Sequence, residues 1–112
     1  MRTQSTRIAT MAISLASLLA FVGVSAAAQD AGASLYKTKS AACHGADGKG
    51  ATAVGKADSI RDLGSADVQG QSDATLTTII TAGKGKMPAY GKSLKPARIT
   101  ALVAYVRSLA SK

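Results

Sequence analysis

The sequence has few of the residues that usually build the core of a small domain. Its 112 residues include no tryptophan, one phenylalanine, three tyrosines and a single cysteine, Cys43. One cysteine cannot form a disulfide within the chain, so a disulfide-stapled fold is excluded. Small domains with little apolar surface to bury often depend on another staple, such as a metal or a cofactor. The composition therefore predicts that a bound cofactor supplies much of the core.

Acidic residues are also scarce. The chain carries 14 lysines and arginines against six acidic residues, all aspartates, which gives a formal net charge of +8 at pH 7. A basic surface of this kind suits nucleic acid, anionic lipid or an acidic protein. No aromatic residues are interleaved with the basic ones, as a stacking surface for single strands would require. Nucleic acid is therefore not an expected partner.

The N-terminal quarter has the pattern of an export signal. Arg2 and Arg7 precede an uncharged apolar run over 8–24, and three alanines at 26–28 provide a cleavage site for a signal peptidase. We expect residues 1–28 to be a cleaved signal peptide and residues 29–112 to form one periplasmic domain without a permanent membrane span. An uncleaved anchor is the alternative, because about 17 apolar residues lie at the lower limit for crossing a bilayer.

Apolar spacing predicts helices, and no alternating strand pattern is present. Three main helices and one further helical turn are expected, over 30–42, from Ser72 to just before Gly83, from Pro96 towards the C-terminus, and over 65–69. The glycine-rich segments 45–62 and 83–91 are expected to be loops. The sequence therefore predicts an all-α domain with long loops.

Cysteine, histidine and methionine are the side chains that fasten a protein to haem, and each occurs once after residue 28, as Cys43, His44 and Met87. His44 directly follows Cys43, so a sulfur bonded to a haem vinyl would bring the imidazole within reach of the iron. Residue 40 lies three positions before Cys43, on the same face of a helical turn. The stretch 40–45 thus has the form of the c-type haem motif C-x-x-C-H, with Ser40 in place of the first cysteine.

With these residues, the chain after residue 28 resembles a small single-haem class I cytochrome c of the exported bacterial kind. Further matching features are Gly32 and Tyr36 in the first helix, Met87-Pro88 in a glycine-flanked loop, and Leu102 and Tyr105 in the last helix. The resemblance implies a small cytochrome c-like fold wrapped around one haem, with the first and last helices crossing near the glycine and the aromatic residues.

The resemblance also implies the roles of individual residues. His44 is expected to be the proximal iron ligand, Met87 the distal iron ligand, and Cys43 the residue that forms a thioether to the haem. Tyr36, Pro88 and Tyr90 are expected to lie against the haem. Ser40 marks the position of the missing first cysteine.

Ser40 separates iron ligation from covalent attachment. A hydroxyl does not replace a thiol in thioether formation, because the thiol is the acidic and nucleophilic group. One haem vinyl would therefore stay free. Three outcomes remain open: a haem held by the single thioether of Cys43, which we favour, a haem held by its iron ligands alone, or no haem.

The leading interpretation is a one-electron carrier and not an enzyme, in which protein ligands fill both axial positions of a c-type haem iron. Its expected partners are redox proteins such as a membrane oxidoreductase, an oxidase or an exported dehydrogenase. They would dock on a basic surface near the haem edge, formed by Lys84, Lys86, Lys92 and Lys95.

Two interpretations from other classes remain. In the first, the chain is a peroxidase-like haem enzyme or a gas sensor, in which Met87 gives way to an external ligand. In the second, it is a basic exported module without haem that binds anionic lipid or acidic protein. Zinc at Cys43 and His44 is disfavoured, because two adjacent ligands do not make a closed tetrahedral site.

Overall fold

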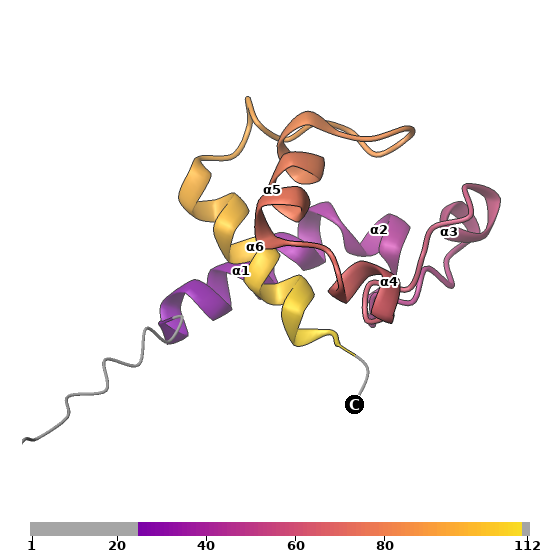
Figure 1. Cartoon of the computed structure of the whole chain (residues 1–112), viewed down its shortest axis with the longest axis horizontal. Helices are drawn as coiled ribbons and strands as arrows, with labels where there is room; N and C mark the ends of the chain where they lie inside the picture. The colour runs from indigo at the N-terminus through magenta and orange to yellow at the C-terminus, as the bar shows by residue number, and fades with distance from the viewer. Residues whose placement is uncertain (1–24, 111–112) are drawn as a thin grey trace, which may run out of the picture.

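The computed structural model describes residues 25–110, in which the chain forms six helices (Figure 1). These are α1 (Ala26–Lys39), α2 (Ala41–His44), α3 (Ala53–Ala57), α4 (Ala66–Gln69), α5 (Asp73–Ala82) and α6 (Pro96–Ser108). The three longest are α1, α5 and α6, so the predicted all-α fold with three main helices is confirmed. Most of the expected signal peptide lies outside the described residues.

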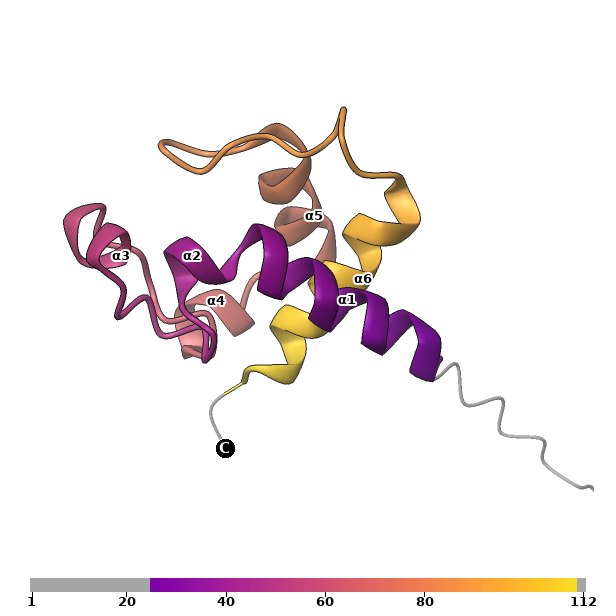
Figure 2. The same cartoon turned by 180° about the vertical axis from the view of Figure 1, so that it is seen from behind.

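The helices α1 and α6 cross at a glycine (Figure 2). A Cβ atom on Gly32 would collide with the backbone carbonyl of Ala101 in α6, so the helices approach this closely only because the side chain is absent. One turn further, the Tyr36 ring is 2% exposed and packs against Tyr105, with ring centroids 4.7 Å apart. Leu102 is buried beside them. The predicted crossing of the first and last helices is confirmed.

The first helix begins earlier and ends earlier than the helix over 30–42 that the sequence predicts. It starts at Ala26, where the Ser25 hydroxyl accepts a hydrogen bond from the Ala28 amide, and it ends at Lys39. Ser40 then forms the junction with the single turn of α2. Its amide still donates to Tyr36, and its carbonyl accepts from the amides of residues 43 and 44. The predicted course into His44 is therefore helical, with a bend at Ser40.

The sequence predicts a loop over the whole segment 45–62. This prediction is wrong in part, because the segment contains the helix α3. The side chain of Thr52 explains the difference. Its hydroxyl accepts a hydrogen bond from the Gly55 amide at 2.8 Å, which caps the short helix, and donates to the Cys43 carbonyl at 2.6 Å. One threonine thus begins α3 and fastens it to α2.

The predictions for the second half of the chain are confirmed. Ser65 and Ser72 cap α4 and α5 with their hydroxyls, and Gly83 ends α5 at φ 75°. The helix α5 packs against α6. Arg107 of α6 pairs with Asp73 at 2.8 Å and also donates hydrogen bonds to backbone carbonyls of the α4–α5 connection.

The buried apolar residues form one cluster in which only one aromatic ring is fully buried. They are Leu35, Tyr36, Val68, Leu76, Ile80, Leu94, Ile99, Leu102, Val103 and Val106. This cluster comes from α1, α4, α5, α6 and the segment before α6. Within residues 25–110, no helix combines the length and the apolar character needed to cross a membrane.

A substitution at Gly32 tests the close helix crossing. Gly32→Ala should lower the free energy of unfolding by about 2 kcal/mol, because the added methyl group forces α1 away from Ala101. Helix propensity alone would instead raise it by about 1 kcal/mol. Chemical denaturation followed by circular dichroism measures the change, with Ala31→Ser on the exposed face of α1 as the control. A stabilised Gly32→Ala variant would contradict the crossing.

Candidate haem cleft

Two cavities meet between α2 and the segment 83–95, which joins α5 to α6 and is called the distal loop below. Four residues line both cavities: Ser40, His44, Met87 and Tyr90. The cavities are therefore two parts of one cleft.

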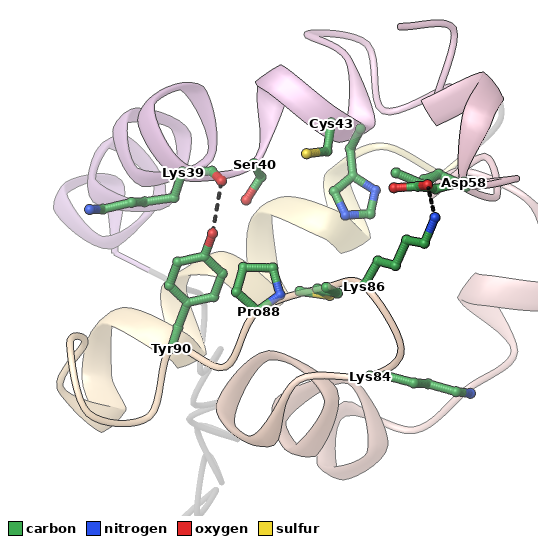
Figure 3. Close-up of a pocket in the computed structure, with 11 residues that line it drawn as sticks. Lys39, Ser40, Cys43, Asp58, Lys84, Lys86, Pro88 and Tyr90 are labelled. Carbon is green, nitrogen blue, oxygen red and sulfur yellow. Dashed lines mark hydrogen bonds and ion pairs between the residues drawn. The ribbon is translucent and has the colours of Figure 1, made fainter. Parts of the chain in front are cut away.

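The two parts of the cleft differ in polarity. The inner part is lined mainly by apolar side chains, among them Tyr36, Leu63, Val68, Leu76, Ile80, Leu102 and Val106. The outer part is lined by Cys43, Pro88 and several charged residues. Figure 3 shows Ser40 and Cys43 at the end of α1 and in α2, facing Pro88 and Tyr90 of the distal loop. All seven residues that the sequence predicted for the haem site line this cleft.

Three consecutive backbone carbonyls on the α2 side of the cleft are each fixed by a hydrogen bond. The carbonyl of Cys43 accepts from the Thr52 hydroxyl at 2.6 Å, and that of His44 accepts from the Gly50 amide at 2.7 Å. The carbonyl of Gly45 accepts from the Tyr36 hydroxyl at 2.6 Å. Burial raises the pKa of Tyr36 to about 12, so this phenol remains a donor at neutral pH. The backbone that carries Cys43 and His44 is thus held from three directions.

The His44 imidazole is suited to binding a metal ion inside an apolar cleft. Burial lowers the pKa of His44 from its usual value, because the charged form is poorly solvated there. At pH 7 the ring is therefore neutral, which is the form that binds metals. Its Nδ1 atom is buried and has no hydrogen-bond partner. A neutral imidazole, a thiol and a thioether around an apolar cavity fit the ligands and the body of a haem.

Met87 is presented by a tight turn in the distal loop. The backbone groups of Lys84 and Met87 bond to each other in both directions, at 3.2 and 3.0 Å. Gly85 stands at the tip of this turn with φ 57°, a conformation that favours glycine. The Met87 side chain is partly buried and packs against the apolar cluster. The distal loop therefore places the Met87 side chain, with its thioether sulfur, where the two cavities meet.

Charged residues surround the mouth of the cleft. Lys39, Lys84, Lys86 and Asp58 line the outer cavity, and Lys86 pairs with Asp58 at 2.8 Å (Figure 3). The hydrogen bond and negative charge of Asp58 raise the pKa of Lys86. The sequence predicts Lys84 and Lys86 near this edge but does not predict Lys39 and Asp58 there. The position of Lys39 next to Ser40 was a signal that could have identified it.

Comparisons with known proteins agree with this architecture. A family model described as "Cytochrome C oxidase, cbb3-type, subunit III" matches residues 27–106. The chain is 40% identical over 86 residues to the Cbb3-type cytochrome c oxidase subunit CcoP of Azospirillum brasilense. It is 37% identical over 79 residues to the Cbb3-type subunit FixP of Azorhizobium caulinodans. The matches cover 75% and 70% of this chain but 29% and 26% of the relatives, so the chain spans less than a third of their length.

A solved structure extends the comparison to the fold. The KustC0563 c-type cytochrome superposes with a TM-score of 0.67 and 30% sequence identity, over 71% of this chain and 98% of that protein. The predicted cytochrome c-like fold is therefore confirmed, and a cytochrome c domain implies a c-type haem. On its match over 27–106, the chain belongs to the family of cytochrome c oxidase, cbb3-type, subunit III.

Proposed function

We propose that the chain is a periplasmic one-electron carrier whose cleft holds one c-type haem, with His44 and Met87 as axial ligands and Cys43 as the only thioether residue. The observation that carries this proposal is the position of His44 and Met87, which line both cavities from α2 and from the distal loop. Cys43 lines the same cleft beside them. Export rests on the N-terminal sequence pattern, which lies mainly outside the described residues.

Each residue of the cleft has a task in this proposal. The bound haem supplies the redox chemistry, because its iron takes up and releases one electron. His44 offers a neutral imidazole from a fixed backbone, and Met87 offers a neutral thioether from the distal loop. The apolar inner wall, which includes Tyr36, excludes water and disfavours a gain of charge at the iron. Pro88 and Tyr90 line the cleft on the Met87 side.

The positions of Ser40 and Cys43 support the proposal of a single thioether. Both residues line the outer cavity: Ser40 directly precedes the single turn of α2, and Cys43 is the third of its four residues. Cys43 is free and partly exposed, so its sulfur is accessible to a vinyl group. Ser40 would face the second vinyl, with which its hydroxyl forms no thioether.

The attachment is tested by the mass of the denatured protein purified from its natural host. We expect the mass of residues 29–112 plus one haem, because Cys43 is the only thiol. Cys43→Ala should release the haem in acidic acetone. Ser40→Cys, the matched gain of function, should form a second thioether and shift the α band of the reduced pyridine haemochrome to shorter wavelength. Extraction of haem from the wild type by acidic acetone would refute the thioether.

The distal ligand is tested by Met87→Ala. Removing the Met87 side chain should open one axial position. The far-red band of ferric methionine-ligated haem should then disappear, and carbon monoxide should bind rapidly to the ferrous iron. Absorption spectroscopy at neutral pH measures both effects, with Thr78→Ala on an exposed part of α5 as the control. An unchanged spectrum would mean that Met87 is not the ligand. Rapid carbon monoxide binding by the wild type would instead favour a haem enzyme or sensor.

We further propose that the carrier exchanges electrons with a membrane oxidoreductase, and the names of the relatives point to an oxidase. Docking would use the basic mouth of the cleft. Lys39→Glu and Lys84→Glu should each slow electron transfer to a purified oxidase about tenfold at low salt, because electrostatic attraction speeds encounter. Stopped-flow mixing measures the rates. Arg98→Glu, which does not line the cleft, should have little effect, and an equal loss there would exclude docking at the mouth.

A further inference from the structure

The distal loop contacts the opposite side of the cleft through two side-chain hydrogen bonds. The Tyr90 hydroxyl donates to the backbone carbonyl of Lys39 at 3.1 Å, and the Lys86 ammonium donates to the Asp58 carboxylate at 2.8 Å (Figure 3). Lys86 directly precedes Met87, and Tyr90 follows it by three residues. The two bonds therefore flank the residue proposed to bind the iron.

We propose that Tyr90 is a positioning residue that holds the distal loop against the end of α1, and thereby keeps Met87 on the iron. This inference rests on the proposed function, since it concerns a haem ligated by Met87. The sequence predicts only that Tyr90 lies against the haem. The role proposed here belongs to its hydroxyl group, which bonds to Lys39.

The acceptor of the Tyr90 bond lies at a special position. Lys39 is the last residue of α1, and the last carbonyls of a helix lack partners within it. Tyr90 supplies such a partner across a separation of 51 residues in sequence. The next residue is Ser40, where the chain lacks the thiol for a second thioether. The hydroxyl thus links the two sides of the cleft at the point where covalent attachment is missing.

The backbone of Tyr90 is as well fixed as its hydroxyl. Its amide donates to the Ile80 carbonyl of α5 at 2.9 Å, and its carbonyl accepts from the Leu94 amide at 2.9 Å. The ring is partly buried against the apolar cluster. A tyrosine side chain also has few rotatable bonds, so little conformational entropy is lost in ordering it. Tyr90 therefore connects α5 to α1, through its amide at one end and its hydroxyl at the other.

The other bond across the cleft, between Lys86 and Asp58, is a restraint that salt weakens. The Lys86 side chain is 78% exposed, and salt weakens ion pairs between such exposed groups. The backbone groups of Lys84 and Met87 bond to each other across the turn. At the tip of this turn, a Cβ atom on Gly85 would meet no other atom within 4 Å. The Tyr90 bond involves no charged side chain, so it is the restraint across the cleft that salt leaves in place.

Tyr90→Phe tests this inference, because it keeps the ring and removes the hydroxyl. In the haem-loaded ferric protein, imidazole binds at the rate at which the methionine leaves the iron. This rate should rise about two- to tenfold, as expected for the loss of one hydrogen bond. Stopped-flow absorption at neutral pH measures it. Tyr105→Phe is the matched control, since it removes a phenol hydroxyl that does not line the cleft.

The possible results separate this inference from the proposed function. If the wild type shows the far-red methionine band and Tyr90→Phe binds imidazole at the wild-type rate, the role of Tyr90 is refuted while ligation by Met87 stands. A lower unfolding midpoint without faster imidazole binding refutes it equally, because Tyr90 would then be purely structural. If high salt alone brings the wild type to the faster rate, the Lys86–Asp58 pair positions the loop instead. A wild type without the methionine band refutes the proposed function itself.

Discussion

The hydrogen bonds that fix three successive carbonyls, those of Cys43, His44 and Gly45, are the constraint on which the rest of the site depends. Their donors come from α1, from the glycine-rich turn and from the cap of α3. The Tyr36 donor is itself set in place by the close crossing of α1 and α6. The position of the His44 backbone therefore follows from packing that joins the N-terminal segments to the C-terminal helix α6.

The two sides of the cleft are held by different means. The α2 side is fixed by buried or partly buried hydrogen bonds around a single helical turn. The distal loop is anchored to α5 through the amides of Tyr90 and Gly91, and Met87 extends from it on a narrow turn. Such a loop can open more easily than the α2 side, because fewer contacts resist its movement. Under the proposed ligation, retention of the Met87 ligand is then decided in the distal loop.

The small apolar cluster also gives the cofactor a structural task. Only one aromatic residue, Tyr36, belongs to the buried cluster, and the inner cavity lies directly against it. A haem in the cleft would extend this cluster with a large apolar body. The relatives named as cbb3 oxidase subunits are more than three times as long as the segment they share with this chain. The cytochrome c domain is thus a unit that occurs in longer proteins.

The sequence by itself determined the all-α class, the limits of α5, the start of α6, and seven of the residues that line the cleft. These features depend on local signals, namely the serine caps, Pro96, Gly83 and the Cys43-His44 pair, which act through neighbouring residues. The bend at Ser40, the helix α3 and the placement of Asp58 at the mouth were decided only by the tertiary structure. Each depends on partners distant in sequence, such as Thr52 on Cys43 and Tyr90 on Lys39, which local spacing does not reveal.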